Sequence, residues 1–257
     1  MKANINVLGV IPARYASTRL SFKVLRPIKG KPLLQWTWEN ASATRSLDKL
    51  IIACDSPEIK KVAEEFGAEV VITSSDHSSG TDRIAEAVRD IDAQVIINIQ
   101  ADEPLMHPSV INDLAQTMLS NTDLVMATVR KKIDKTDEID NSNVVKVICD
   151  KDNFAIYFSR FPIPYYRSFD EKKYYKHLGI YAYTKDFLYT FKNSPSSYLE
   201  KAEKLEQLRA IESGYKIKVI ETIFDSQGVD TEDDLYKVEE IISNELNRKR
   251  NLNEKKG

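Results

Sequence analysis

The sequence predicts an α/β fold built on a mostly parallel, twisted sheet, and two observations lead to this prediction. Short apolar runs with the length of buried strands alternate with segments of helical spacing over about the first 130 residues. This alternation is typical of parallel strands that are covered on both faces by helices. From about residue 130 the pattern changes to segments of antiparallel character. We therefore expect a single domain over residues 1–246, with a smaller antiparallel lobe inserted at about 130–185 and a flexible tail over 247–257.

The first strand is expected to lead into a basic loop. An apolar run over residues 5–11 breaks at Pro12, and a helical pattern starts after Pro32. Between them lie three cations: Arg14, Arg19 and Lys23. Such a strand–loop–helix unit is how an open α/β sheet presents a phosphate site. The loop lacks both the P-loop spacing and the G-x-G-x-x-G turn, so neither a P-loop ATPase nor a Rossmann dehydrogenase is indicated. A solvated surface loop is the alternative.

The remaining elements follow from apolar runs and helix signals taken in order. Strands are expected over residues 49–54, 70–72, 95–99 and 124–129. Between them, helices are expected over residues 58–69, 83–91 and 108–119, and Pro57 is placed to open the first of these. Antiparallel strands are expected over 144–149, 154–159 and 177–183. A helix over 200–213, a strand over 216–221 and a helix from Glu232 complete the chain.

Composition narrows the class of protein. The chain has 257 residues, a net charge of -2 and 30% charged residues, which argues against nucleic-acid and membrane-surface binding. No apolar stretch approaches the roughly 18 to 20 residues of a membrane-spanning helix, and the first apolar run is too short for a secretory signal. Cys54 and Cys149 lie in unrelated contexts, so neither a disulfide framework nor a zinc site is indicated. We expect a cytoplasmic protein.

Polar residues that directly follow the predicted strands are candidates for a site, because the carboxyl ends of parallel strands meet at one edge of the sheet. These are the basic loop, Asp55, the loop over residues 76–83, and the pair Asp102–Glu103. An aspartate at such a position suits Mg²⁺, although Asp102 taken alone fits a turn or helix cap equally well. Asp230 precedes a predicted helix, where a capping role for it or for Thr231 is the alternative. Cations together with carboxylates are the minimum equipment for phosphoryl or nucleotidyl transfer.

A series of motifs carries a more specific resemblance. In order along the chain they are IPARYASTRL, GKP at 30–32, SSDHSSGTDR, INIQADEP, YFSRFPIP, KHLGIYAY, EKLEQLRAIESGYKI and GVDTEDDL. Together they resemble the 3-deoxy-manno-octulosonate (Kdo) cytidylyltransferases, also called CMP-Kdo synthetases, from residue 5 to about 240. The resemblance implies a Rossmann-like nucleotidyltransferase fold whose smaller lobe mediates dimerisation. It also implies CTP and Kdo as substrates, Mg²⁺ as cofactor, and a cytoplasmic homodimer in lipopolysaccharide precursor synthesis.

The resemblance also assigns roles to residues of this chain. The implied catalytic residues are Arg14, Lys23, Asp102 and Asp230, of which Asp102 and Asp230 are the metal ligands. The implied nucleotide-binding residues are Arg14, Ser17, Lys23, Ser79, Gly80, Arg83 and Gln100. The implied sugar-acid residues are Arg160, His177, Tyr181, Glu206 and Gln207. Their cation, imidazole, amide, phenol and carboxylate groups suit a substrate with one carboxylate and several hydroxyls.

The histidines allow simpler interpretations. Without the resemblance, His177 fits a buried core histidine as well as it fits a ligand. His77, in the loop expected near the nucleotide, is compatible with a purely structural role. His107 is expected to face solvent or to pack near a helix start.

Two departures from the family pattern leave alternatives open. Where the family reads R-L-P-G-K-P, this chain has Arg19-Leu20-Ser21-Phe22-Lys23-Val24, and Ala101 replaces a glycine. Phenylalanine resists backbone angles that glycine permits, so the loop is expected to follow a different path or to be more mobile. Ala101 is expected to narrow the approach to the metal. One alternative is a catalytically silent, CTP-binding paralogue. The other is a cytidylyltransferase for another sugar acid, and the motifs KHLGIYAY and EKLEQLR argue against this second alternative.

Overall fold

The computed structural model describes residues 5–16, 20–168 and 172–254, with side chains as far as residue 248. Its strands are β1 (Ile5–Ala13), β2 (Pro27–Ile28), β3 (Lys31–Pro32), β4 (Lys49–Cys54), β5 (Glu69–Ile72), β6 (Ala93–Asn98), β7 (Met126–Lys132), β8 (Lys146–Cys149), β9 (Ala155–Ser159), β10 (Tyr175–Thr184) and β11 (Lys218–Thr222). The main sheet runs in the order β11-β7-β10-β6-β1-β4-β5. Strands β6, β1, β4 and β5 are parallel neighbours, as are β7 and β11. The mostly parallel α/β sheet predicted from the sequence is confirmed.

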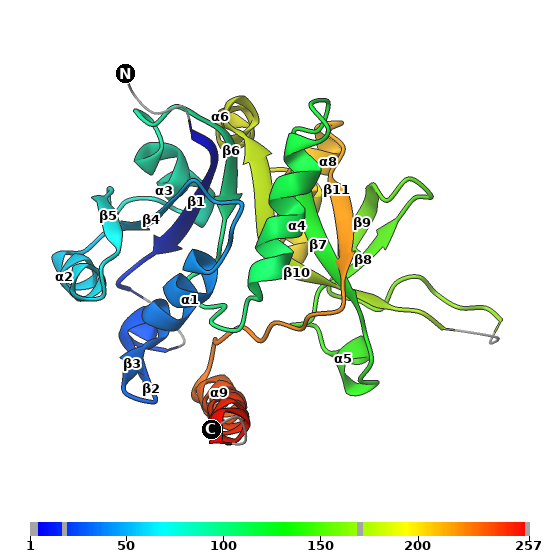
Figure 1. Cartoon of the computed structure of the whole chain (residues 1–257). Helices are drawn as coiled ribbons and strands as arrows, with labels where there is room; N and C mark the ends of the chain where they lie inside the picture. The colour runs from blue at the N-terminus through cyan, green and yellow to red at the C-terminus, as the bar shows by residue number, and fades with distance from the viewer. Residues whose placement is uncertain (1–4, 17–19, 169–171, 255–257) are drawn as a thin grey trace.

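Helices cover both faces of this sheet (Figure 1). They are α1 (Leu33–Ser42), α2 (Pro57–Glu65), α3 (Gly80–Ala87), α4 (Pro108–Leu119), α5 (Asp137–Asp140), α6 (Lys185–Asn193), α7 (Tyr198–Glu203), α8 (Leu208–Glu212) and α9 (Glu232–Glu254). Because side chains alternate along a strand, β1 supplies Val7 and Ile11 to one core, with α1, α2 and α4. The same strand supplies Leu8 and Val10 to a second core, with α3, α6 and α8.

Strand β10 joins the sheet to the lobe. Its C-terminal half runs antiparallel between β6 and β7, and its N-terminal end pairs through Lys176 with Lys146 of β8. Strands β8 and β9 form an antiparallel hairpin that projects from the main sheet (Figure 1). The antiparallel strands predicted at 144–149, 154–159 and 177–183 are therefore present, but the last of them is also a central strand of the main sheet.

Local signals explain several boundaries. Helix α2 begins at Pro57 as predicted, and the Ser56 side chain accepts a hydrogen bond from Ile59 N. Helix α3 begins at Gly80, earlier than the helical spacing indicated, and Ser79 is its N-cap. This earlier start places Ser79 and Gly80 at a helix N-terminus, next to the end of β1.

One predicted helix is wrong. The segment 200–213 forms two short helices, α7 and α8, because Lys204 takes a left-handed backbone with φ 55° and ends α7. Glu203 explains the break, since its backbone oxygen accepts a 2.7 Å hydrogen bond from Arg160 Nε and its carboxylate accepts another from Ser159. After the break, Glu206 accepts a hydrogen bond from Thr81 of α3, and Gln207 is buried.

Helix α9 docks separately, below the sheet (Figure 1). Leu235, Val238 and Ile242 pack in a small core with Ile28 and Leu33. The backbone is helical as far as Glu254, while the flexibility predicted for residues 247–257 stays a prediction. In the part of the chain that the structure describes, no helix has the length and apolar character to cross a membrane.

Candidate active site

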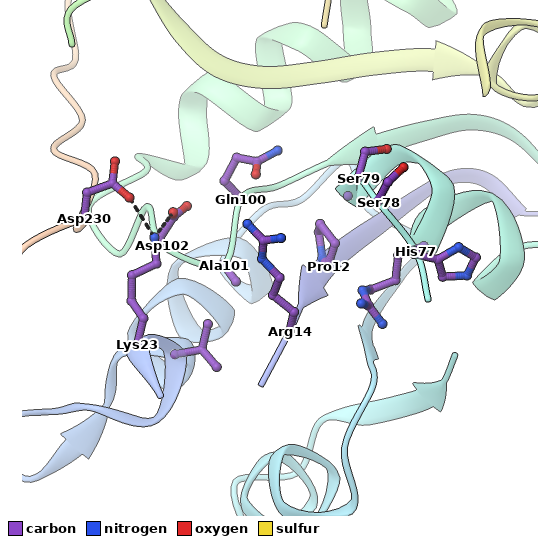
Figure 2. A pocket seen from close by; sticks show the side chains of 13 residues that line it. Pro12, Arg14, Lys23, His77, Ser78, Ser79, Gln100, Ala101, Asp102 and Asp230 are labelled. Atoms are coloured by element: carbon purple, nitrogen blue, oxygen red, sulfur yellow. Dashed lines mark hydrogen bonds and ion pairs between the residues drawn. The ribbon is translucent and has the colours of Figure 1, made fainter. Parts of the chain in front are cut away.

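A cavity of about 300 Å³ opens where β1 and β6 end, beside the start of α3 (Figure 2). It is lined by Pro12, Arg14, Lys23, Val24, His77, Ser78, Ser79, Gly80, Arg83, Gln100, Ala101, Asp102 and Asp230. The lining contains every residue predicted to be catalytic. It also contains every residue predicted to bind the nucleotide except Ser17, which lies outside the described residues. The expected meeting of these side chains at one sheet edge is therefore observed.

A lysine and two aspartates form the charged centre of this cavity (Figure 2). Lys23 Nζ donates hydrogen bonds to Asp102 Oδ2 at 2.5 Å and to Asp230 Oδ1 at 3.0 Å. Burial opposes the charged form of Lys23, but Asp102 and then Asp230 outweigh it and raise the pKa of the lysine above its ordinary value. Lys23 is therefore an ammonium ion at neutral pH, and it offsets the repulsion between the two carboxylates.

Thr231, not Asp230, caps helix α9. Asp234 N donates a 3.2 Å hydrogen bond to Thr231 Oγ1, and Thr231 N donates one of 3.0 Å back to Asp234 Oδ2. This reciprocal pair satisfies the first turn of the helix. The Asp230 side chain is thereby left to face Lys23 (Figure 2).

The segment that carries Asp230 is pinned to the segment that carries Asp102. Val229 N donates a 2.9 Å hydrogen bond to the backbone oxygen of Asp102. The rings of Phe224 and His107 stack with centroids 3.6 Å apart and planes 4° apart. His107 also caps α4 through Nδ1, so it packs at a helix start, as one of the two sequence interpretations stated. These contacts hold the two carboxylates opposite each other.

Glu103 strengthens the same junction. Its carboxylate accepts a short hydrogen bond from the Ser226 hydroxyl, and a Cβ on Gly228 would lie only 3.1 Å from Glu103 Oε1. Burial is the main reason that the pKa of Glu103 rises to about 7, and the nearby charges of Asp102 and Asp230 add to it. From the sequence, Glu103 is a candidate only as the neighbour of Asp102. Its contact with Ser226, 123 positions away, has no local signal.

A helix N-terminus forms the opposite wall of the cavity. Ser79 Oγ accepts a 3.1 Å hydrogen bond from Asp82 N at the start of α3. A Cβ on Gly80 would lie 3.4 Å from Pro12 Cγ, so glycine permits the close approach of α3 to the end of β1. Free backbone N–H groups at such a helix start attract anionic ligands.

Arg83 is anchored beside this wall. Its guanidinium donates to Asp55 Oδ2 at 2.9 Å and to Thr73 Oγ1 at 2.7 Å, and its side chain is buried. Asp55 Oδ1 in turn accepts a 2.8 Å hydrogen bond from Tyr15 N, at the start of the basic loop. Arg83 and Asp55 therefore fix the loop start, while the exposed Arg14 side chain lines the cavity.

The loop residue that replaces a glycine keeps a glycine-like backbone. Phe22 has φ 53° and ψ 35°, in the left-handed region that side chains resist. Its ring lies 4.6 Å from that of Tyr15. The short 3₁₀ turn η1 (Lys23–Leu25) follows directly and buries Val24, which directs Lys23 at the aspartates. Phe22, which stands where the family pattern has glycine, therefore carries backbone strain.

Three other lining residues complete the floor. Gln100 Nε2 donates a 3.0 Å hydrogen bond to Asn98 Oδ1, and Ala101 is almost fully buried. The His77 ring nitrogen Nε2 makes a short contact with a carboxylate oxygen of Glu86. His77 therefore has a structural partner and also lines the cavity.

The residues predicted to bind the sugar acid lie outside the lining of this cavity. His177 and Tyr181 on β10 have ring centroids 5.3 Å apart. His177 Nε2 lies 2.8 Å from Thr128 Oγ1, whose hydroxyl donates to the backbone oxygen of Ile180 at 2.7 Å. A Thr128 hydroxyl that donates to Ile180 accepts from His177 Nε2, which then carries the proton of a neutral ring. Burial lowers the pKa of His177 to about 3, in agreement with a neutral imidazole.

Of the other three candidates, Arg160 and Glu206 make hydrogen bonds within the protein, and Gln207 is buried. Arg160 Nε donates to the backbone oxygen of Glu203 at 2.7 Å, so part of its guanidinium holds the break between α7 and α8. Glu206 accepts hydrogen bonds from Thr81 Oγ1 and Arg209, each at 2.8 Å, and burial raises its pKa.

The two aspartates fit a divalent metal ion. Among the described residues, no three His, Cys, Asp or Glu side chains converge on one point as a complete metal cage. Mg²⁺ in nucleotide sites commonly takes only one or two carboxylates, and substrate phosphates and water complete its octahedron. Asp102 and Asp230 already bracket one cation, the Lys23 ammonium group, with hard oxygen ligands. The donor set therefore suits Mg²⁺ together with a nucleotide.

Comparisons with known proteins agree over most of the chain. Residues 8–220 match the model of the cytidylyltransferase family. The 3-deoxy-manno-octulosonate cytidylyltransferase of Solibacter usitatus is 45% identical, over 92% of this chain and 94% of that protein. The protein of the same name from Fusobacterium nucleatum is 46% identical, over 90% of this chain and 94% of its own length.

A solved structure supports the same assignment. CMP:2-keto-3-deoxy-manno-octonic acid synthetase complexed with CTP superposes with a TM-score of 0.89 at 38% identity, covering 93% of this chain and 99% of that chain. A cytidylyltransferase from Leptospira borgpetersenii, 16% identical with a TM-score of 0.63, shares the fold. The sequence matches and the fold agree, and the chain belongs to the 3-deoxy-manno-octulosonate cytidylyltransferase family, as a nucleotidyltransferase of the CMP-Kdo synthetase type.

Proposed function

We propose that the protein transfers CMP from CTP to the anomeric hydroxyl of Kdo, or of a close analogue such as 8-amino-Kdo, and releases pyrophosphate. The reaction depends on Mg²⁺ and supplies an activated sugar acid for lipopolysaccharide synthesis. The observation that carries this proposal is the contact of Lys23 with Asp102 and Asp230 inside one cavity. This arrangement combines a cation for phosphates with two carboxylates for a divalent metal.

The cavity offers a distinct wall to each part of the nucleotide. Arg14 and Lys23 lie on the side of the basic loop, where their charges would offset the charge on the departing pyrophosphate. Ser79 and Gly80, at the N-terminus of α3, supply polar donors on the opposite wall. The nucleotide would therefore lie between the loop and the helix, with its α-phosphate near Asp102.

In the reaction, the 2-hydroxyl oxygen of the sugar acid attacks the α-phosphorus of CTP. One oxygen–phosphorus bond forms, the bond from the α-phosphorus to the bridging oxygen breaks, pyrophosphate leaves, and the hydroxyl proton passes to solvent. Asp102 and Asp230 would hold Mg²⁺, which supplies Lewis-acid activation of the hydroxyl and charge neutralisation of the phosphates. Lys23, released from the aspartates, would then pair with the phosphates.

The sugar acid would bind next to this centre, along β10 and the start of α8. Gln100 adjoins β10, because a Cβ on Gly179 would lie 3.8 Å from its Cγ. His177, Tyr181, Glu206 and Gln207 would supply a neutral imidazole, a phenol, a carboxylate and an amide to the sugar's hydroxyls and carboxylate. Arg160 would contribute the positive charge.

The proposed setting is a cytoplasmic homodimer formed through the lobe. On the lobe's connection between β9 and β10, Phe161 is 75% exposed and Tyr165 is 89% exposed. Apolar side chains in such positions suit a contact between two copies. Light scattering after size exclusion would test this, and a monomer at micromolar concentration would contradict it.

Pyrophosphate release tests the proposed reaction. The assay contains CTP and Mg²⁺ and compares Kdo, 8-amino-Kdo and N-acetylneuraminate as acceptors. We expect release with Kdo or its amino analogue and little with N-acetylneuraminate. Release with N-acetylneuraminate alone would assign another sugar acid, and no release by a folded protein that binds CTP would identify a silent paralogue.

A further inference from the structure

The buried hydroxyl group of Thr81 connects the helix that forms the wall expected to bind the nucleotide with the residues expected to bind the sugar. Thr81 follows Gly80 in the first turn of α3, and its Oγ1 donates a 2.8 Å hydrogen bond to Glu206 Oε2. The two residues are 125 positions apart in the sequence. Thr81 is 1% exposed, so water cannot replace this donor if it is lost.

The carboxylate of Glu206 has a second fixed partner. Its Oε1 atom accepts a 2.8 Å hydrogen bond from Arg209, within the same turn of the chain. The two donors bind different oxygens, so together they set the orientation of the carboxylate plane. Arg209 approaches from α8 and Thr81 from α3. Ser79, the N-cap of α3, is a further hydrogen-bonding neighbour of Glu206, so the carboxylate is held at the start of the helix that forms the nucleotide wall.

We propose that Thr81 is a positioning residue that orients Glu206 for the sugar acid and so couples the sugar subsite to the nucleotide-binding end of α3. This inference rests on the proposed function, in which Glu206 contacts the acceptor. Thr81 itself touches neither reacting group. Its effect must therefore fall on binding of the acceptor more than on binding of CTP.

The matched substitutions are Thr81→Val and Thr81→Ser. Valine has nearly the same shape but no hydroxyl, and serine keeps the hydroxyl. Loss of a hydrogen bond to a carboxylate corresponds to roughly tenfold or more in an equilibrium constant. We expect Thr81→Val to raise the KM for Kdo about tenfold while the KM for CTP changes less than about twofold. Thr81→Ser should retain most of the wild-type KM for Kdo.

Two controls separate positioning from a general loss of packing. Thr44→Val changes another buried threonine, which is not part of the cavity lining, and should leave both KM values unchanged. In a Glu206→Ala background, adding Thr81→Val should have no further effect on the KM for Kdo, because the group that Thr81 orients is already gone.

The outcomes distinguish this inference from the proposed function. If wild-type protein does not use Kdo or its amino analogue, the proposed function fails. If wild-type protein uses Kdo but Thr81→Val leaves its KM unchanged, or raises the KM for CTP equally, the positioning role is wrong. An additive effect of Thr81→Val on top of Glu206→Ala would likewise overturn it.

Discussion

Lys23 occupies the position between Asp102 and Asp230 that a divalent metal would take, so replacing it should strengthen metal binding while it weakens catalysis. The substitution Lys23→Met keeps much of the aliphatic length and removes the charge. In the absence of nucleotide, a metal ion must displace the ammonium group from both carboxylates before it can bind. Methionine offers no such competition.

The size of the effect follows from the geometry. Lys23 is 13% exposed, while Asp102 and Asp230 are 31% and 44% exposed, so solvent screens both ion pairs and the second one more strongly. Partly exposed pairs of this kind are each worth up to about 1 kcal/mol. A total of about 1.5 kcal/mol corresponds to roughly tenfold tighter metal binding.

Mn²⁺ serves as the probe, because its electron paramagnetic resonance signal reports the unbound ion directly. We expect Lys23→Met to bind Mn²⁺ roughly tenfold more tightly than wild type without CTP. Turnover should fall about 100-fold or more, since a cation that stabilises the transition state is missing. Lys31→Met, which removes a comparable 2.8 Å pair with Glu39 outside the cavity lining, is the control and should change neither value. Unchanged or weaker Mn²⁺ binding by Lys23→Met would refute the reasoning.

Three further predictions address the metal, the loop and the histidine on β10. Asp102→Asn should abolish pyrophosphate release while circular dichroism and the thermal midpoint stay close to wild type; preserved turnover would rule out its metal role. Both Phe22→Gly and Phe22→Ala lose the contact with Tyr15, but only glycine adopts the left-handed backbone of residue 22 without strain. Urea denaturation should therefore find the glycine variant about 1 kcal/mol more stable than the alanine variant. Equal stability of the two variants would show that the backbone with φ 53° is not strained. The pKa of His177 is about 3 in the folded state and near 6.5 when unfolded, so between these values the unfolded chain binds more protons and stability falls with acidification. His177→Gln, which still offers a donor to Thr128, should flatten this part of the stability curve between pH 3.5 and 6.5; an unchanged slope would contradict the assignment.

The order of the helices and strands could be predicted because each of them is indicated by its own residues and their immediate neighbours. Runs such as Val95–Ile99 are apolar at every position but Asn98, and Pro57 opens a helix in a way that neighbouring residues alone decide. The same logic placed the candidate residues at one edge, since the ends of β1 and β6 must meet wherever these strands are adjacent and parallel. The motif resemblance then supplied chemistry that periodicity cannot.

Two features of the fold had no local signal. Strand β10 runs antiparallel between β6 and β7, which depends on pairing among three distant segments. The left-handed Lys204 interrupts a stretch with good helical spacing, because contacts of Glu203 with Ser159 and Arg160 outweigh helix propensity there. In both cases tertiary contacts decided against the local pattern.

The site shows the same division. The motif resemblance assigned Lys23 to the phosphates and the two aspartates to the metal, as separate roles. In the structure Lys23 contacts both aspartates, although Asp102 lies 79 positions and Asp230 207 positions further along the chain. Thr231 and Asp234 satisfy the helix start between themselves, which argues against the capping role for the Asp230 side chain, while its role as a metal ligand stays a prediction. Which partner a side chain such as Asp230 has depends on tertiary contacts, and the spacing of residues in the sequence does not determine these.

The departures in the basic loop change its backbone energy rather than its charge. Phe22 stands where the resembling family has glycine, yet it adopts the left-handed angles, and the next residue still reaches both aspartates. Contact with Tyr15 and burial of Val24 offset part of that strain. Because the ion pairs also hold the loop, binding of a metal and a nucleotide would release Lys23 and with it one restraint on a strained turn. The substitution at residue 22 should therefore affect how readily the loop leaves the conformation it has without ligands, while the positive charges of the loop stay the same.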